Sequence, residues 1–579
     1  MVEENTDKAW CVASQLGANV RELAAALGVP ELLARALINR GVREPCDAEK
    51  FLNPSSLHLE DPFAFKDMGR AVERVLAALK DGQKILIQGD YDVDGSASAA
   101  LLVNLFRLLG ADVEASIPSR SEDGYGLSER VVRDAAARGV KLLITCDNGT
   151  TACKEVACAN SLGIDVVITD HHTVGDELPA ALALMNPHVK GESVAFRDLC
   201  GAGVAFKFAW AILQKASQGA RLDANFRDFL QGAQSLVALA AVADVVPLRG
   251  ENRVLCRYGL RLLPESPNPG LRALMEVAGL TRAPSGSDVA FKLAPRLNAG
   301  GRMGRESLAV ELLTSGSYGD ALRLAQEADS ANKKRQTLDR ELTRLARELV
   351  LADPGYENER VLVLGHEGFN AGLVGIVAAR LTETFNKPAV LVALNGEAGR
   401  GSGRSIPGFH LYNALNDCAH LMRRFGGHEQ AAGLEISTAN MGLLRRSINE
   451  VADKHVMNAD YRTPTLDIDA ETNLAELDVS TVERLSQFEP FGEGNPEPVF
   501  MARGVELSSA PRVVGRGQGH LSLLVKQGGP ALKAIGFGMG PQATGLARGS
   551  RVKLAFTPRI SDFRGSREVE IEIKDLRPE

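Results

Sequence analysis

The chain has 579 residues, of which 45% are hydrophobic and 24% charged, and its net charge is −7 at pH 7. Ordinary globular composition excludes a disordered, collagen-like or coiled-coil protein, and the length predicts several domains. The negative charge excludes a uniformly basic nucleic-acid-binding protein, so any polyanion site must be local.

The sequence offers no targeting or membrane signal. Its N-terminus lacks an apolar signal core, and no apolar run reaches transmembrane length, which predicts a cytoplasmic protein with no membrane contact. The eight cysteines are scattered without a Cys-x-x-Cys pair, as expected of reduced and mostly structural thiols.

The first half of the chain has the pattern of an α/β protein. After a helical segment at residues 1–60, apolar strands alternate with helical segments through a domain at residues 61–317. Such alternation is typical of a parallel, doubly wound sheet. The predicted strands are residues 85–88, 113–117, 142–146, 166–169 and 182–185.

The second half predicts a connector and two further domains. Residues 318–352 have leucines on one helical stripe, so we expect a connector helix of roughly 50 Å that ties two domains together across a cleft. A smaller α/β domain follows at residues 353–462. Residues 463–579 then show short strands and Gly-rich turns, which favour a β-barrel of the OB-fold type.

The C-terminal domain is also locally basic. From Arg503 onward the chain has 13 Lys and Arg against 7 Asp and Glu, a surplus of positive charge in an otherwise acidic protein. This asymmetry marks the predicted barrel as a candidate nucleic-acid surface, with a protein-docking barrel as the alternative.

An acidic turn follows the first predicted strand. Asp90, Asp92 and Asp94 lie between the apolar run at 85–88 and a predicted helix, at the strand end where open α/β sheets bind ligands. Three carboxylates this close repel one another unless a cation or backbone donors compensate. Alone, the turn is equally compatible with a solvated helix N-cap.

The same arrangement recurs after two more strands. Asp147 follows the strand at 142–146, and Asp170-His171-His172 follows the strand at 166–169, while Asp244 could close the set. Carboxylates and imidazoles without thiolates favour Mn²⁺ or Mg²⁺ over structural zinc. The number of carboxylates predicts two ions, the usual device for phosphoryl displacement.

These motifs resemble a known family. Asp-His-His with an upstream Asp-x-Asp resembles the DHH phosphoesterase superfamily, and seven motifs in order resemble its RecJ family of single-strand-specific 5′→3′ DNA exonucleases. The resemblance runs from about residue 60 to the C-terminus and implies a DHH domain, a DHHA1 domain and a cleft between them. The motifs are Gly-Asp-Tyr-Asp-Val-Asp-Gly, Cys-Asp-Asn-Gly-Thr, Asp-His-His, Ala-Asp-Val-Val-Pro, residues 296–304, residues 401–405 and Gly-Gly-His at 426–428.

The resemblance implies metal ligands at matching positions. Asp147 would bridge two ions. Related pyrophosphatases have a histidine where this chain has Gln88, and Asp90 would substitute for it. The implied ligands are Asp90, Asp92, Asp94, Asp147, His171 and Asp244.

Other positions match the family's substrate contacts. His172 and His428 would contact the scissile phosphate and the transition state, with help from Arg296. Read without the family, His428 could follow a helix stop, Arg296 and Arg302 could be solvated loop charges, and residues 401–405 could be a flexible linker. The resemblance implies that Arg120, Ser402 and Arg404 bind a terminal 5′ phosphate, that Tyr125 stacks on a base and that Arg302 contacts substrate.

These observations predict a two-metal exonuclease of single-stranded DNA that releases 5′-mononucleotides in recombination and repair. The alternatives are a phosphodiesterase of short oligonucleotides or cyclic dinucleotides, and a catalytically inactive DNA-binding scaffold. The long connector and the barrel argue against the first, and the retained acidic motifs argue against the second. The resemblance also implies a single-strand-binding protein and a RecQ-type helicase as partners, and a monomer.

Overall fold

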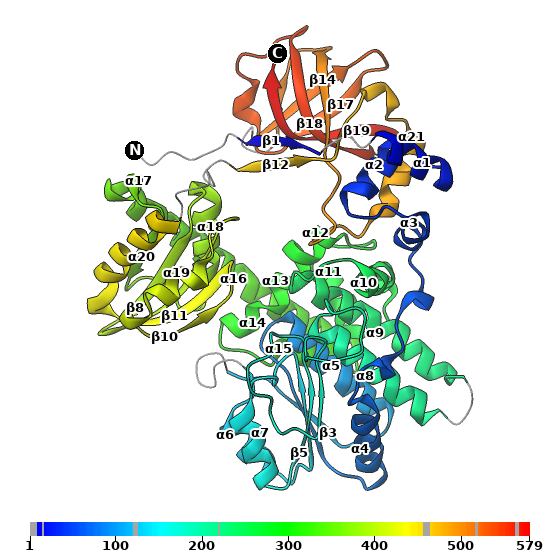
Figure 1. Cartoon of the computed structure of the whole chain (residues 1–579), viewed down its shortest axis with the longest axis vertical. Coiled ribbons are helices and arrows are strands. Elements are labelled where there is room, and N and C mark those ends of the chain that lie inside the picture. Colours follow the sequence, from blue (N-terminus) through cyan, green and yellow to red (C-terminus); the bar gives the residue numbers. More distant parts are fainter. Residues whose placement is uncertain are drawn as a thin grey trace. The chain divides into compact units, whose positions relative to one another are not determined.

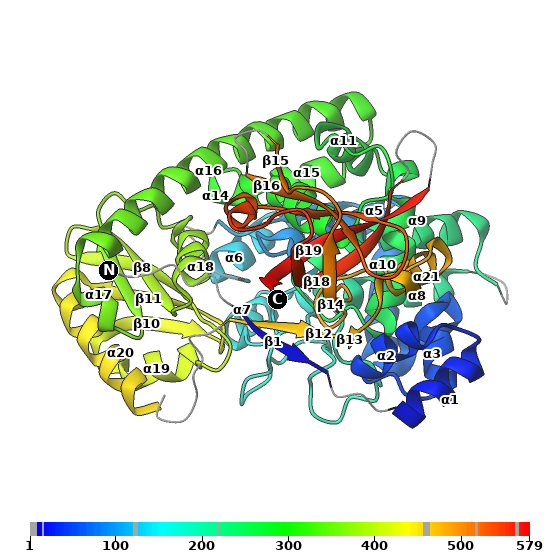
Figure 2. The same cartoon turned by 90° about the horizontal axis from the view of Figure 1, so that it is seen from above.

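The computed structural model describes residues 8–13, 17–119, 126–217, 221–455, 464–515, 519–561 and 567–579 (Figures 1 and 2). The chain divides into two compact units. The smaller unit comprises Met1–Cys11 and Ser330–Asp467, and the larger comprises Val12–Asp329 and Ile468–Glu579. Helix α16 (Tyr318–Ala352) carries the chain from one unit to the other and coincides with the predicted connector helix.

A parallel sheet lies at the centre of the larger unit. Its strand order is β3-β2-β4-β5-β6, and every neighbouring pair is parallel. The predicted parallel sheet is therefore confirmed. Its strands are β2 (Ile85–Gln88), β3 (Val113–Ser116), β4 (Leu142–Cys146), β5 (Asp165–Thr169) and β6 (Ala183–Met185).

Helices cover both faces of this sheet. Successive strand residues point to opposite faces, so Ile85 and Ile87 join one apolar cluster whereas Leu86 joins another. The first cluster includes α4, α5, α8 and α9, and the second includes α6 and α7. These helices are α4 (Met68–Lys80), α5 (Val93–Leu108), α6 (Glu129–Ala137), α7 (Cys153–Ser161), α8 (Gly201–Ala216) and α9 (Ala224–Ala243).

Further helices link this layer to the connector. The segment Val289–Leu293 (η4) is a π-helix, a rare form that is frequent near functional sites. The others are α10 (Gly250–Leu262), α11 (Pro269–Val277), α12 (Gly286–Asp288), α13 (Ala294–Leu297), α14 (Ala299–Arg302) and α15 (Leu308–Leu313).

The C-terminal segment forms a closed barrel, as expected of an OB-fold. Its strand order is β13-β14-β18-β19-β17-β16-β15, and an additional pairing of β14 with β16 closes it. Helix α21 (Val479–Leu485) lies between the first and second strands of the barrel in chain order. The strands are β13 (Ala470–Glu471), β14 (Phe500–Leu507), β15 (Arg512–Val514), β16 (His520–Lys526), β17 (Leu532–Gly536), β18 (Arg551–Ser561) and β19 (Glu568–Pro578).

The N-terminal helices share a core with this barrel. Helices α1 (Gly17–Leu27), α2 (Glu31–Asn39) and α3 (Pro45–Leu52) contribute buried leucines to the apolar cluster that contains Phe500 and Phe556. Strand β1 (Ala9–Val12) pairs with β12 (Thr465–Ile468). The two ends of the chain therefore fold together.

The smaller unit contains a mixed sheet with strand order β10-β11-β9-β8-β7, in which only β7 and β8 are parallel. Helices α18 (Val374–Phe385), α19 (Leu411–Asp417) and α20 (Met441–His455) accompany it, with α17 (Gly355–Asn358) after the connector. The strands are β7 (Leu362–His366), β8 (Ala389–Asn395), β9 (Ala398–Arg404), β10 (Met422–Gly427) and β11 (Ala431–Ser437).

One alternative left open by the sequence is wrong in this unit. Residues 401–405, which could have been a flexible linker, mostly lie within strand β9. A Cβ on Gly399 or Gly401 would lie 2.5 or 2.8 Å from Val392, so these alternating glycines let β9 pack closely on side chains of β8. Within the described residues, no helix has the length and apolarity that a membrane crossing requires.

The shared core predicts that α2 stabilises the larger unit. Leu37 is 0% exposed and Leu57 is 90% exposed. Leu37→Ala should lower the free energy of unfolding by about 2–5 kcal/mol, since it leaves a cavity. Leu57→Ala should change it by less than about 0.5 kcal/mol. Chemical denaturation of both variants, followed by circular dichroism, checks this, and equal losses would contradict the shared core.

Candidate metal centre

The acidic turn after β2 is held by backbone donors. Asp92 is the N-cap of α5 and accepts a hydrogen bond from the Gly95 amide at 3.0 Å. Asp94 accepts hydrogen bonds of 2.7 Å from the amides of Gly201 and Ala202 at the start of α8. These donors and the positive end of α8 offset part of the repulsion among the carboxylates. The N-cap interpretation is therefore correct for Asp92, but it does not account for Asp90 or Asp94.

Residues from β4, β5 and α9 meet this turn. His171 Nε2 lies 3.0 Å from Asp147 Oδ1 and 3.6 Å from a carboxylate oxygen of both Asp94 and Asp244. Asp244 is the C-cap of α9, and Asp147 adopts a left-handed φ of 62° directly after β4. The parallel sheet thus brings residues that are far apart in sequence to one edge.

The side chains form three overlapping groups that could hold metal ions. In each group the potential ligand atoms lie within 4.8 Å of one another, and Asp147 belongs to two groups. Among the described residues, neither His171 Nε2 nor Asp90 Oδ1 makes a hydrogen bond, although both atoms are buried. Oxygen and imidazole ligands with unsatisfied buried atoms fit a hard divalent cation. The groups are Asp147-His171-His172, Asp94-His171-Asp244 and Asp90-Asp92-Asp147.

Asp170 and Asn186 orient His172, and neither was among the site residues predicted from the sequence. The Asp170 carboxylate lies 2.8 Å from His172 Nδ1 and accepts hydrogen bonds from the amides of His171 and Thr150. Asn186 donates to the His172 carbonyl at 2.9 Å. Asp170 therefore supports the adjacent histidines. The sequence signal that could have identified this role is the position of Asp170 directly before the two histidines.

Burial dominates the electrostatics of the cluster. Burial, reinforced by neighbouring carboxylates, raises the pKa of Asp90 and Asp244 to about 8, that of Asp94 to about 7 and that of Asp147 well above its ordinary value. Burial and the charge of His172 lower the pKa of His171 to about 4, which leaves a neutral imidazole able to ligate.

His172 differs from its neighbour. Burial alone would lower the pKa of His172, but the hydrogen bond to Asp170 and the charges of Asp170, Asp244 and Asp94 outweigh it and raise the pKa to about 9. The two adjacent histidines are therefore electrostatically distinct, one neutral and one cationic at neutral pH.

The other predicted residues of the larger unit are placed as follows. Arg296 forms an ion pair with Asp329 at 2.9 Å and donates to the Lys292 carbonyl at 2.6 Å. Arg302 ends α14, and a Cβ on the preceding Gly301 would lie 3.2 Å from the Tyr91 carbonyl oxygen of the acidic turn. Arg120 and Tyr125 lie outside the described residues.

Three predicted residues belong to the smaller unit. Arg404 Nη1 donates to Ser402 Oγ at 3.0 Å, and both residues lie on β9. A Cβ on Gly375, in the first turn of α18, would lie 3.0 Å from Ser402 Oγ and 3.1 Å from Arg404 Nη2. The hydroxyl and the guanidinium therefore sit beside a helix N-terminus. His428 is exposed, and its amide donates to the Ala431 carbonyl.

Comparison with known proteins agrees with this architecture. Residues 84–233 match the DHH family N-terminal domain, 358–454 the DHHA1 domain and 468–575 the RecJ OB domain. A Dickeya dadantii protein is 36% identical over 570 residues, covering 95% of this chain and 96% of its own. The chain belongs to the RecJ family.

Two further relatives extend the comparison. A Bacillus subtilis RecJ is 34% identical over 559 residues, covering 96% of this chain and 69% of its own. The Bacillus subtilis and Dickeya dadantii relatives are both named single-stranded-DNA-specific exonuclease RecJ. A crystal structure of Thermus thermophilus RecJ in complex with Mn²⁺ matches with a TM-score of 0.83 and 30% identity, covering 99% of this chain and 80% of that chain.

The close approach of α8 to Asp147 can be tested at Gly201. A Cβ there would lie 2.6 Å from Asp147 Cβ and 3.0 Å from its Cα, so Gly201→Ala must displace Asp147. We expect Mn²⁺ affinity, measured by calorimetry, to fall roughly 10–100-fold, as when a ligand's support is lost. Gly69→Ala is the control, because its Cβ would meet nothing within 4 Å. Equal affinities in the two variants would refute the contact.

Proposed function

We propose that this chain is a metal-dependent exonuclease that hydrolyses single-stranded DNA from its 5′ end and releases 5′-mononucleotides. The observation that carries the proposal is the cluster around Asp147 in a chain of the RecJ family. The relatives' name supports the substrate class, and the Mn²⁺ complex of Thermus thermophilus RecJ supports the cofactor. The proposed setting is cytoplasmic DNA recombination and repair by a monomer.

We assign two ions, Mn²⁺ or Mg²⁺, to the overlapping groups. Asp147 and His171 are each shared between two groups, and Asp147 is the proposed bridge because a carboxylate can offer one oxygen to each ion, whereas a neutral imidazole offers a single nitrogen. When bound, the ions supply an activated water and stabilise the charge that develops on the phosphate. The assigned ligands are Asp90, Asp92, Asp94, Asp147, His171 and Asp244.

The remaining site residues would act on the phosphodiester. Asp170 fixes the His172 ring through Nδ1, so we assign Nε2 the contact with the scissile phosphate. Arg296 would assist after exchanging its ion pair with Asp329 for a phosphate, and Arg302 would contact the backbone of the strand. His428, exposed at the end of β10, is the proposed contribution of the smaller unit to the transition state.

The terminal 5′ phosphate is assigned to the smaller unit. Ser402 and Arg404 lie beside the first turn of α18, where backbone amides and the helix dipole favour an anion. Arginine adds charge-assisted hydrogen bonds to phosphate oxygens. Arg120 and Tyr125 remain part of the proposal as a second phosphate contact and a base-stacking residue.

The barrel would bind the rest of the strand. Many of its basic residues are neutralised by cross-strand ion pairs, such as Lys526–Glu506 and Arg559–Glu572. A better candidate for strand contact is the side chain of Phe537, which is 59% exposed. The centroid of its ring lies 5.3 Å from that of the His520 ring. Exposed aromatic rings stack on bases with little sequence preference. A single-strand-binding protein and a RecQ-type helicase stay as proposed partners.

Loss of the bridging carboxylate should separate catalysis from binding. Asp147→Ala should abolish hydrolysis of an end-labelled strand in Mn²⁺ or Mg²⁺, while affinity for the strand stays within a few-fold, because affinity rests mainly on phosphate contacts. Asp176→Ala, an exposed aspartate, is the matched control. Turnover above about a tenth of the unaltered enzyme in Asp147→Ala would count against the metal assignment.

The end anchor predicts a dependence on the 5′ group. A 5′-hydroxyl strand should be cut roughly tenfold more slowly than a 5′-phosphorylated one, since it loses the contacts that fix the first nucleotide. Arg404→Ala should erase this difference, whereas Arg423→Ala, exposed on β10, should preserve it. The measurement is the single-turnover rate on 5′-phosphorylated, 5′-hydroxyl and circular strands for each protein. Efficient cutting of the circle would defeat the anchor.

A further inference from the structure

A cavity of about 800 Å³ lies in the larger unit, between residues 257–288, which follow the DHH match, and residues 482–560 of the OB match. One wall consists of α10 and the turn Arg282–Asp288, and the other of α21, residues 486–498 and β18. None of the residues assigned to the metal centre lines it. Its volume falls in the range of small-ligand and cofactor sites, roughly 300–1,000 Å³.

The two walls are fitted to each other. A Cβ on Gly286 would lie 2.3 Å from the Phe491 carbonyl oxygen, so only glycine permits this approach. Arg257 Nη1 donates to the Glu489 carbonyl at 2.7 Å and crosses from α10 to the opposite segment. Because both walls belong to one compact unit, the cavity is a built feature of the fold.

The charges of the cavity favour an anion. Arg257, Arg261 and Arg282 line it, and none of them forms an ion pair with a described residue. Two of the lining carboxylates are already engaged, since Asp288 pairs with Lys292 at 2.7 Å and Glu497 with Arg559 at 3.0 Å. This leaves a local surplus of positive charge, and arginine is suited to phosphate oxygens.

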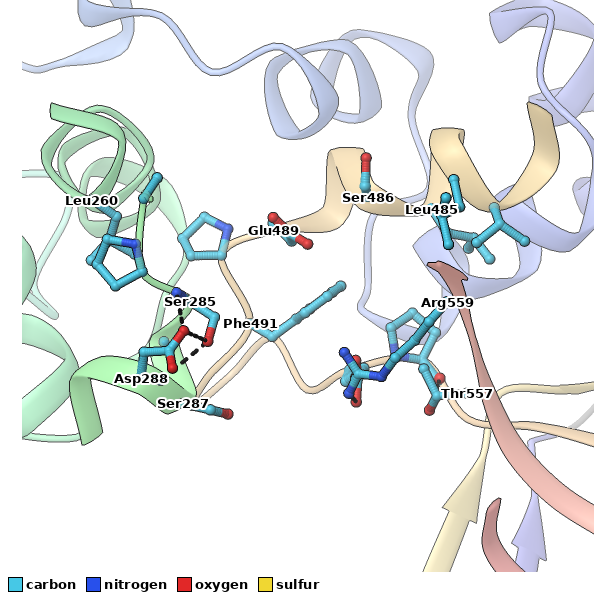
Figure 3. Close-up of a pocket in the computed structure, with 18 of the residues that line it drawn as sticks. Leu260, Ser285, Ser287, Asp288, Leu485, Ser486, Glu489, Phe491, Thr557 and Arg559 are labelled. Carbon is cyan, nitrogen blue, oxygen red and sulfur yellow. Dashed lines mark hydrogen bonds and ion pairs between the residues drawn. The ribbon is translucent and has the colours of Figure 1, made fainter. Parts of the chain in front are cut away.

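The rest of the lining favours a flat, partly apolar group. Figure 3 shows the Phe491 side chain between the Ser285–Asp288 turn and Arg559. Leu260 and Leu485 provide apolar surface. The Glu489 carboxylate makes no hydrogen bond or close ion pair with another described residue, although the charges of Arg257 and Arg282 act on it, and it can accept from an amino group. An aromatic ring, an acceptor and three arginines together match a base attached to a phosphate.

We propose that this cavity is an accessory site for a nucleoside 5′-monophosphate, with the phosphate on Arg257, Arg261 and Arg282 and the base against Phe491. The site goes beyond the proposed exonuclease function, because it requires no metal and no scissile bond. A nucleotide bound there would contact both walls and stabilise their packing.

The test is equilibrium binding of dAMP to the full chain in chelator, where metal-dependent hydrolysis is prevented. Calorimetry should show dAMP binding more tightly than either inorganic phosphate or deoxyadenosine, since each carries only half of the recognised groups. Arg282→Ala and Phe491→Leu should each weaken dAMP binding about tenfold, and Phe491→Leu retains apolar packing while removing the ring. Arg227→Ala, an exposed arginine of α9 outside the cavity, should bind dAMP unchanged.

Three results would overturn the proposal. The first is no dAMP binding at about 1 mM, where weak small-molecule sites are still detectable. The second is equal weakening in Arg227→Ala, which would indicate non-specific ionic attraction. The third is phosphate binding as tightly as dAMP with no effect of Phe491→Leu, which would indicate a plain anion site. Hydrolysis of labelled DNA by the same variants is measured separately. An absence of dAMP binding would therefore refute the accessory site without contradicting the proposed exonuclease function.

Discussion

The carboxylates of Asp90, Asp94, Asp147 and Asp244 repel one another at the carboxyl edge of the parallel sheet, and much of the larger unit serves to hold them there. Burial raises the pKa of each of them, so the folded chain pays in desolvation for a site that a cation can stabilise. Backbone amides at the start of α8 supply the nearest compensation, at 2.7 Å from Asp94.

The close packing around this edge explains its glycines and its backbone strain. A Cβ on Gly95 would lie 2.3 Å from the Asp90 amide nitrogen, and one on Gly201 would meet Asp147. Asp147 itself and Val245, which follows Asp244, have left-handed φ angles of 62° and 60°. Strained residues persist where the surrounding structure fixes them, and here both flank or form the metal groups.

The parallel sheet and the gathering of acidic side chains at its edge were predictable because they depend on local patterns. An apolar run followed by Asp90, Asp147 or Asp170 identifies both a strand and the edge where these side chains meet. Sequence reasoning was undecided where packing against a neighbouring strand determines the outcome. The glycines of residues 401–405 were compatible with a flexible linker, although glycine at every second position is also what a strand needs when side chains cover one of its faces.

The role of the first 60 residues also lay beyond local patterns, since it depends on partners 202 to 455 positions away. Arg40 donates to Asn495 Oδ1 at 3.0 Å and to Asp469 Oδ1 at 3.0 Å, and Asn39 donates to the Asp469 carbonyl. Buried Arg253 donates to the carbonyls of Phe51, Gln487 and Phe488, each at 2.8 Å.

These contacts make the N-terminal helices, the DHH region and the barrel parts of one folded unit. Removal of one partner would leave a buried guanidinium without its acceptors, which is far costlier than the loss of an exposed ion pair. A truncated chain without the barrel would therefore lose structure as well as the proposed binding surface. The proposed contribution of the barrel to single-strand binding is separable only through exposed side chains such as Phe537, which lies outside the shared core.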